Sequence, residues 1–348
     1  MGYQLMIEAP RRVGVVEYEE PALAPQEVRL RTLYSGISAG TELTLYRGSN
    51  PYLEKSWNAG WRLFEPTDAG SWSYPHPAIG YEELGEVTEV GAEVVGILAP
   101  GQLVWGAWGH RSTHVVPADW ALQRRLPGGV DPVCGIFGQI GSIALNAILD
   151  ADIHLGETVA VFGQGVPGQM VTRLAKASGA EVVAIDRLPQ RLELARSGGA
   201  DHVINGASVD AAAAVKELTG GRGADVSIEI SGSYAALHEA IRATARNSRV
   251  VVSGFYQGGA APLRLGEEFH HNRVELVSSQ IGGIARHLDH RWDRLRLEQT
   301  IMRLQQVGKV DFQRLITHRF PARDLQQAYE LLDQTPEAVG QVVLEFQA

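Results

Sequence analysis

A glycine-rich loop at residues 163–168 sharply narrows the possible folds of this 348-residue chain. The loop, GQGVPG, places Gly163, Gly165 and Gly168 in G-x-G-x-x-G spacing, after the apolar run TVAVF and before the helical pattern QMVTRLAKA. A second apolar run follows and ends at Asp186. A strand, a loop of this kind, a helix and a second strand that ends in an acid are typical of a dinucleotide-binding unit.

Each glycine of this loop has a predicted role. Gly163 permits the tight turn, Gly165 lets backbone N–H groups approach a pyrophosphate, and Gly168 lets the helix pack closely on the strand. The pyrophosphate would lie at the N-terminus of the helix, near Val166, because unpaired N–H groups and the helix dipole favour anions there. The loop therefore predicts a bound dinucleotide.

The acid at the end of the second strand favours NAD over NADP. Asp186 can accept hydrogen bonds from both ribose hydroxyls of NAD and would repel a 2′-phosphate. Arg187 follows it directly and could pair with such a phosphate, so NADP stays an alternative. Arg191 is placed to flank the adenosine, and we also assign Ser231 and Gly254 to the cofactor-binding site.

The patterns on either side of residue 140 predict two different domains. Short β-branched runs separated by proline and glycine turns fill the first third of the chain and predict a β-barrel-like domain. Strand and helix patterns alternate afterwards, which predicts a doubly wound parallel sheet and an α/β fold class overall. We assign residues 1–139 and 284–348 to the β-rich domain and residues 140–283 to the dinucleotide-binding domain.

Composition and charge exclude several classes of protein. The net charge of −9, with no long run of one sign, argues against nucleic-acid binding and against an anionic membrane surface. The N-terminus lacks a signal-peptide pattern and we find no apolar run of membrane-spanning length, so we expect cytoplasmic residence. Cys134 is the single cysteine, which excludes an intrachain disulfide and a cysteine-rich zinc site.

Residues 48–73 interrupt the strand pattern and contain three of the seven tryptophans. We expect an irregular insertion there. It is either a packed surface loop or a lid or wall of the substrate site, because long loops without regular structure are often functional.

Together these segments resemble the medium-chain dehydrogenase/reductase superfamily over nearly the whole chain. The resemblance is carried by the glycine loop and by SGISAGTEL (35–43), AIGYEELGEVTEVG (78–91), APGQLVW (99–105) and GSIALNAI (141–148). It implies a GroES-like β-barrel catalytic domain, a Rossmann domain, hydride transfer with a nicotinamide cofactor and a small-molecule substrate. It also implies a homodimer or tetramer, in which the edge strand RVELVSS of the dinucleotide sheet pairs with its two-fold mate.

This sequence departs from the zinc-dependent members of that superfamily at the ligand positions. Their cysteine before Gly-Thr-Asp/Glu is replaced by Ser38 or Ala39, and their Gly-His-Glu histidine by Tyr81. Hydroxyl oxygens are poor zinc ligands, and Glu82 alone cannot hold the metal. We therefore predict a zinc-independent member.

Two histidines leave a metal-binding alternative open. His110 and His114 are spaced as if they share one face of a strand, and together with Glu82 they could form a zinc site.

Without a metal, hydrogen-bond donors must stabilise the substrate oxygen. Tyr81 is the best candidate because a phenol both donates and accepts, and we expect it to point into the cleft between the domains. Thr41 and Ser38 offer hydroxyls on the facing loop, and Glu82 could bond to the backbone behind it. Each also has a structural alternative: Tyr81 as a ring that fills the vacated space, and Thr41 and Ser38 as turn and cap residues.

Three functions remain compatible with the sequence. The first is an NAD(P)-dependent oxidoreductase acting on an alcohol/ketone pair, with a sugar, polyol or secondary alcohol as substrate. The second is an enoyl or quinone reductase, which in this superfamily also works without zinc. The third is a non-catalytic dinucleotide-binding protein.

Overall fold

The computed structural model describes residues 1–67, 70–77 and 80–346, which form two compact units. The first unit consists of Met1–Gln139 and Ile316–Ala348, and the second of Ile140–Leu315. The segment 284–315 therefore belongs to the second unit, whereas the sequence analysis assigned it to the first. The reason is the packing of helix α9 (Arg294–Gln306), whose buried Ile301 contacts Gly141 of the second unit.

The second unit, which is described throughout, is built on one parallel sheet of six strands. Their order is β12-β11-β10-β13-β14-β15, so the chain moves outward in one direction from β10 and then in the other. This order confirms the predicted doubly wound sheet, and its switch point lies between β10 and β13. The strands are β10 (Thr158–Phe162), β11 (Glu181–Asp186), β12 (His202–Asn205), β13 (Ala224–Glu229), β14 (Thr244–Val252) and β15 (Glu275–Ser278).

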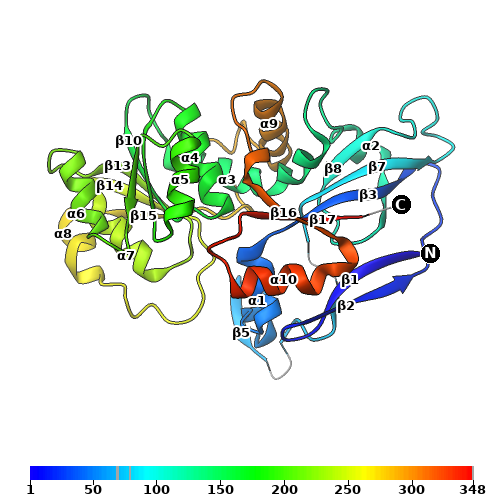
Figure 1. The fold of residues 1–348 in the computed structure, drawn as a ribbon, viewed down its shortest axis with the longest axis horizontal. Coiled ribbons are helices and arrows are strands. Elements are labelled where there is room, and N and C mark those ends of the chain that lie inside the picture. Colours follow the sequence, from blue (N-terminus) through cyan, green and yellow to red (C-terminus); the bar gives the residue numbers. More distant parts are fainter. Residues whose placement is uncertain (68–69, 78–79, 347–348) are drawn as a thin grey trace. The chain divides into compact units, whose positions relative to one another are not determined.

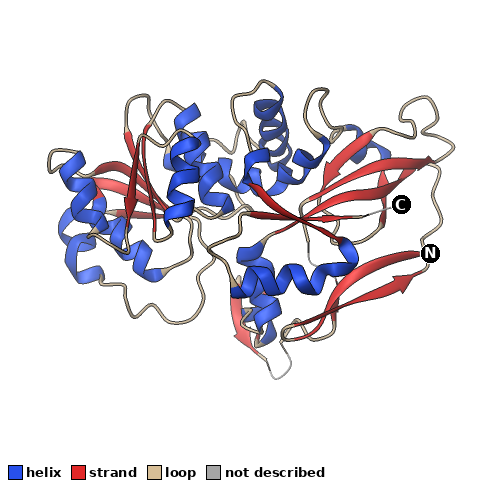
Figure 2. Cartoon of the chain, in the orientation of Figure 1, coloured by secondary structure: helices blue, strands red, loops and turns tan. Residues whose placement is uncertain are grey.

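Helices cover both faces of this sheet (Figures 1 and 2). The strands are accordingly buried on both sides, as in β10, where all five residues are buried. The helical elements are α3 (Phe137–Ala151), α4 (Val166–Ala177), α5 (Pro189–Ser197), α6 (Ala211–Leu218), α7 (Tyr234–Ala243), the π-helical turn η3 (Leu265–Phe269), α8 (His270–Asn272), α9 (Arg294–Gln306) and the short η4 (Gln313–Leu315).

The first unit is β-rich, as predicted. Its largest sheet runs β16-β17-β3-β7-β8, with β9 also paired to β3, and a smaller sheet runs β2-β1-β6. The strands are β1 (Gly2–Ala9), β2 (Arg12–Tyr18), β3 (Glu27–Ile37), β6 (His76–Pro77), β7 (Glu83–Val90), β8 (Leu103–Gly106), β9 (Thr113–Pro117), β16 (Ile316–Pro321) and β17 (Gln341–Glu345). The helical elements are α1 (Ala39–Arg47), η1 (Pro51–Leu53), α2 (Ala118–Leu122), η2 (Pro132–Ile136), η5 (Ala322–Asp324) and α10 (Leu325–Gln334).

Two neighbouring strands of the large sheet, β3 and β7, carry parts of two of the segments on which the resemblance rests, 35–43 and 78–91. Strand β3 leads directly into α1, and Tyr81 and Glu82 stand immediately before β7. The two strands are antiparallel and place Ser35 opposite Glu83. The end of β3 and the start of β7 therefore lie side by side.

The insertion at residues 48–73 contains more regular structure than expected. Strands β4 (Lys55–Asn58) and β5 (Leu63–Pro66) form a hairpin with Trp57 opposite Phe64. These two rings contact each other edge to face at 5.1 Å between centroids, and such aromatic cross-strand pairs stabilise a hairpin. Residues 68 and 69 lie outside the described part of the chain.

One stretch passes a length and composition test for membrane spans. It is Pro132–Ala151, although the sequence was expected to contain no apolar run of membrane-spanning length. Since 83% of its most apolar window is buried inside the structure, the stretch lies in the protein core.

Candidate active site

The glycine loop of the second unit has the geometry that its spacing predicts. Gly163 has a φ of 96°, and a Cβ there would lie 2.7 Å from the Cβ of Ser231. A Cβ on Gly168 would lie 1.8 Å from the carbonyl oxygen of Gly163, so helix α4 packs directly on the loop. By contrast, a Cβ on Gly165, the N-cap of α4, would find its nearest atom, on Arg191, 4.0 Å away. The loop is therefore tightly packed at Gly163 and Gly168. It leaves open space at Gly165, next to Val166, where a phosphate would approach.

Asp186, at the end of β11, holds this loop in place. Its carboxylate accepts hydrogen bonds from the backbone N–H groups of Gln164 at 2.7 Å, Arg187 at 2.7 Å and Leu188 at 3.0 Å. Arg191 approaches the same carboxylate at 3.9 Å, whereas Arg187 is exposed. Each carboxylate oxygen has two acceptor positions, so Asp186 can fix the loop and still accept from a ribose hydroxyl.

The predicted cofactor residues Ser231 and Gly254 both lie beside Glu229, which was not predicted from the sequence as part of the site. Glu229, the last residue of β13, accepts hydrogen bonds from the backbone of Ser231 and from the hydroxyls of Ser231 and Tyr256. Gly254 packs against the backbone of the same turn, since its Cβ would lie 2.3 Å from the nitrogen of Gly232. Burial raises the pKa of Glu229, and these hydrogen bonds partly offset the rise. An acid that ends an apolar strand was the available signal.

In the first unit, three predicted hydroxyl residues lie together. The phenol of Tyr81 is hydrogen-bonded to the Ser38 hydroxyl and donates to the Thr41 hydroxyl at 3.2 Å. Ser38 stands at the N-cap of α1, but its side chain makes no cap hydrogen bond to the described helix residues. Its hydroxyl is directed to Tyr81 instead. We call Ser38, Thr41 and Tyr81 the hydroxyl cluster.

Burial controls the protonation of Tyr81 and Glu82. Burial and the neighbouring Glu82 raise the pKa of Tyr81, although the two hydroxyls of the cluster oppose the rise. Burial, followed by Glu42 and Glu83, raises the pKa of Glu82 well above its ordinary value. The Tyr81 phenol therefore keeps its proton at neutral pH, and burial disfavours the ionised form of Glu82.

Glu82 faces inward rather than bonding to the backbone. Its side chain is 1% exposed, and neither carboxyl oxygen has a hydrogen-bond partner of good geometry among the described residues. Gly36 leaves room for it, because a Cβ there would lie 2.5 Å from the Glu82 Oε2 atom. The expected backbone-bonding role of Glu82 is therefore wrong, and its main-chain carbonyl instead accepts from the N–H of Gly36.

A buried polar network that the sequence analysis missed lies beside the hydroxyl cluster. The His110 Nε2 atom lies 2.8 Å from the Glu42 Oε2 atom, and its Nδ1 atom lies 2.7 Å from the Ser35 Oγ atom. Ser35 donates to Glu83 at 2.9 Å, and Tyr329 donates to Glu42. Although burial alone would lower the pKa of His110, Glu42 and Glu83 raise it. Only tertiary structure joins residues so distant in the chain.

His110 and His114 do not share one strand face, which corrects the expectation from their spacing. Strand β9 begins at Thr113, so His110 precedes it, and the ring of His114 is stacked on Trp108 at 6.0 Å between centroids. Burial lowers the pKa of His114 to about 4. The two imidazoles therefore have different surroundings, and their pKa values shift in opposite directions.

The side chains around Tyr81 do not fit a zinc ion. Its nearest hydrogen-bond partners are hydroxyls, and burial disfavours the ionised form of Glu82. Both ring nitrogens of His110 are already hydrogen-bonded. Within residues 1–67, 70–77 and 80–346, no group of three metal-ligating side chains includes Glu82, His110 or His114. Zinc in proteins takes thiolate, imidazole and carboxylate ligands, and the hydroxyls of Ser38, Thr41 and Tyr81 are none of these.

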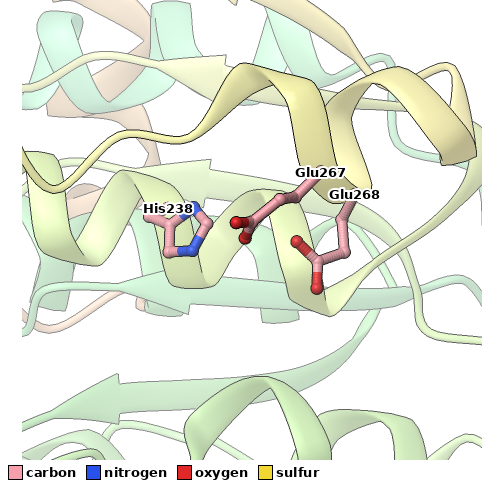
Figure 3. Close-up of side chains that lie close together, drawn as sticks. All are labelled: His238, Glu267 and Glu268. Carbon is pink, nitrogen blue, oxygen red and sulfur yellow. The ribbon is translucent and has the colours of Figure 1, made fainter.

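One group of metal-ligating side chains does occur in the second unit. His238 of α7 faces Glu267 and Glu268 of η3 (Figure 3). Both carboxylates already have cationic neighbours, since Arg264 lies 3.5 Å from Glu267 and Arg242 lies 3.6 Å from Glu268. These guanidinium groups compete with a metal ion for the same oxygens, so we assign no metal to this group.

Comparisons with known proteins agree with this geometry. Residues 167–296 match the family model described as "Zinc-binding dehydrogenase". The chain is 30% identical over 341 residues to D-guloside 3-dehydrogenase of Escherichia coli K12, covering 96% of this chain and 97% of that protein. The family match lies wholly within the second unit, so it does not bear on positions 38 and 81.

Solved structures share the fold. An Escherichia coli oxidoreductase/dehydrogenase of unknown specificity, involved in membrane biogenesis, superimposes with a TM-score of 0.80 at 20% identity, covering 100% of this chain and 99% of that one. A Sinorhizobium meliloti protein described as a zinc-binding dehydrogenase, bound to NADP, gives a TM-score of 0.77 at 20% identity, with 99% of each chain covered. At these identities the likeness concerns the fold alone.

Replacing either of two glycines of the first unit with alanine should change the stability of the protein, in opposite directions. A Cβ on Gly80 would lie 2.4 Å from the ring of His110, whereas a Cβ on Gly40 in α1 would meet nothing within 4 Å. Gly80→Ala should destabilise the protein by about 1–3 kcal/mol through overpacking, and Gly40→Ala should stabilise it by up to about 1 kcal/mol through helix propensity. Urea unfolding followed by tryptophan fluorescence measures both. A Gly80→Ala variant as stable as the wild type would mean that the His110 ring lies elsewhere.

Proposed function

Because this chain belongs to the medium-chain dehydrogenase/reductase superfamily, we propose that it oxidises a secondary hydroxyl of a sugar, glycoside or other polyol, with NAD as hydride acceptor. The observation that carries the substrate class is the 30% identity to D-guloside 3-dehydrogenase over 97% of that protein. The loop geometry around Gly163 and Gly168 supports the dinucleotide.

The reaction divides the work between the cofactor and the hydroxyl cluster. A bound nicotinamide would take a hydride from the carbon that bears the hydroxyl, the hydroxyl proton would pass to water, and a ketone would result. The protein must therefore stabilise the developing negative charge on the substrate oxygen. We assign this task to Tyr81, whose phenol is protonated and therefore available as a donor.

The hydrogen bonds of Tyr81 are suited to exchange with a substrate. Its bond to Thr41 is 3.2 Å long, at the weak end of the range for hydroxyl groups. A substrate oxygen can compete for this proton, while Ser38 stays bonded to the phenol and holds its orientation. Thr41 then remains as a second hydroxyl that can bond to a neighbouring group of a polyol.

Glu82 lies beside Tyr81 and disfavours a negative charge on its phenol. An ionised Glu82 would repel a phenolate at Tyr81, which is how it raises the pKa of the phenol. We therefore assign Tyr81 the role of donor rather than base, and Glu82 an electrostatic role behind it.

The proposal is tested by an absorbance assay of the reduced nicotinamide. The wild-type protein, with NAD, should reduce the cofactor in the presence of at least one glycoside or polyol and not with simple primary alcohols. The same assay run with NADH and a panel of enones and quinones tests the reductase alternative. A protein that binds NADH but turns over neither panel would be a dinucleotide-binding protein without this activity.

We further propose that the activity needs no zinc, because the side chains around Tyr81 suit hydrogen bonding better than metal ligation. Protein purified without added metal should contain far less than one zinc per chain by elemental analysis. Prolonged dialysis against a chelator should leave the melting temperature and the turnover number unchanged. One tightly held zinc per chain, lost together with activity, would overturn this proposal.

Replacing Tyr81 should separate cofactor binding from turnover. Tyr81→Phe removes the donor and keeps the ring, so kcat should fall by about 10²–10⁴-fold, the range for a lost acid or oxyanion donor. The dissociation constant of NADH, measured by nicotinamide fluorescence, should not change. Tyr74→Phe is the matched control, because the Tyr74 phenol only donates to the carbonyl of Leu45. Unchanged turnover in Tyr81→Phe would reduce Tyr81 to a ring that fills space.

Asp186 should set the preference for NAD over NADP. Asp186→Asn removes the charge that repels a 2′-phosphate, so the ratio of the NADP and NAD dissociation constants should fall at least about tenfold. Asp201→Asn is the control, because Asp201 precedes β12 at the opposite end of the same sheet. A wild-type protein that binds NADP more tightly than NAD would refute the assignment.

We also propose a homodimer or a dimer of dimers. Strand β15 ends the order of the second sheet, so one side of it offers unpaired backbone groups. Antiparallel pairing with β15 of a second copy would satisfy these groups under two-fold symmetry.

A further inference from the structure

We propose that His110 is a positioning residue that fixes Ser38 and Tyr81 in hydrogen-bond contact, an inference that rests on the function proposed above for the hydroxyl cluster. His110 is 1% exposed and precedes β9, so it belongs to neither segment that it would hold. Its contacts reach both segments.

On one side, His110 acts through Glu42. Its Nε2 atom lies 2.8 Å from the Glu42 Oε2 atom, and the Glu42 Oε1 atom accepts the backbone N–H of Ser38 at 2.7 Å. The Glu42 carboxylate thus links Ser38, the N-cap of α1, to the buried His110 ring. Because the Ser38 hydroxyl bonds to Tyr81, a shift of this backbone would move that hydroxyl away from the phenol.

On the other side, His110 packs against the residue before Tyr81. A Cβ on Gly80 would lie 2.4 Å from the Nδ1 and Cε1 atoms of the ring, so the imidazole occupies the space beside this backbone. The Nδ1 atom is also bonded to Ser35, which donates to Glu83, two residues after Tyr81. One ring therefore contacts or bonds both sides of the Ser38–Tyr81 pair.

When Glu83 is ionised, the donors and acceptors in the network require a doubly protonated ring. Ser35 has one hydroxyl proton and donates it to Glu83, so it can only accept from the His110 Nδ1 atom. Glu42 accepts hydrogen bonds from the Ser38 N–H and the Tyr329 hydroxyl and acts only as an acceptor. The proton in its contact with the Nε2 atom therefore comes from the His110 ring. A neutral imidazole has a single N–H and could satisfy only one of these two contacts.

A stabilising role alone explains the network poorly. Glu42, Glu83 and Ser35 are all fully buried, and a buried ion pair is often no more stable than apolar residues of the same volume. The pair instead fixes geometry, because each of its hydrogen bonds sets the position of one group relative to another. The role of His110 is therefore to orient its neighbours.

The first experiment needs no substrate. Protein labelled with [¹³Cζ]tyrosine gives a resonance for Tyr81, assigned by its absence in Tyr81→Phe. His110→Gln should shift this resonance, because the phenol changes its hydrogen bonds. His114→Gln is the matched control: it removes an imidazole stacked on Trp108, outside the network, and should leave the resonance in place. A Tyr81 resonance unmoved in His110→Gln would overturn the proposal.

A second measurement uses the wild-type protein, in case His110→Gln does not fold. Long-range ¹H–¹⁵N spectra at pH 7 should show a proton on the His110 Nε2 atom, which bonds to Glu42. A ring without a proton on this atom would lack the bond to Glu42 and would overturn the proposal.

The kinetic readout separates positioning from general stability. His110→Gln should lower kcat by about 10–100-fold, as expected for a misplaced reacting group, with KM and the NADH dissociation constant unchanged. His114→Gln should keep the wild-type kcat. Equal kcat in His110→Gln and wild type would refute the positioning role. If the wild type oxidises no alcohol, the proposed function fails, and the two spectroscopic measurements still decide the role of His110.

Discussion

The pairing of β3 with β7 is the constraint on which the first unit depends. With Ser35 opposite Glu83, the residues that follow β3 and those that precede β7 are brought to one place. The chain reverses through α1 on one side and enters β7 from Gly80 on the other. A slip of one residue in this register would turn Glu83 out of the interior and separate Ser38 from Tyr81.

What this register assembles is a set of buried oxygen groups and one buried imidazole. Burial raises the pKa values of Tyr81 and Glu82, and the facing Glu42 and Glu83 raise the pKa of His110. Here hydrogen bonds between side chains and backbone do the organising, and the buried imidazole stands between the carboxylates of Glu42 and Glu83.

The two units differ in how far apart their functional residues lie in the sequence. In the second unit, Gly163, Gly168 and Asp186 lie within one strand–helix–strand segment, so their spacing alone indicates their positions. In the first unit, the residues that determine the state of Tyr81 come from β3, α1, β7, the segment before β9, and α10. This difference explains why the glycine loop was predicted residue by residue, whereas Glu42, Glu83, His110 and Tyr329 were not.

The sequence by itself determined the α/β class, the parallel sheet, the dinucleotide loop and the superfamily, because each depends on local periodicity or on short fixed spacing. It also identified Ser38, Thr41 and Tyr81 as a group, since they occupy two short segments of the resemblance. Only the tertiary structure decided that segment 284–315 packs with the second unit, that His110 and His114 have separate surroundings, and that Glu82 is a buried acid without a backbone partner. The physical reason is that burial and charge pairing arise from side chains far apart in the chain, and these act on a residue only after the sheet has brought them together.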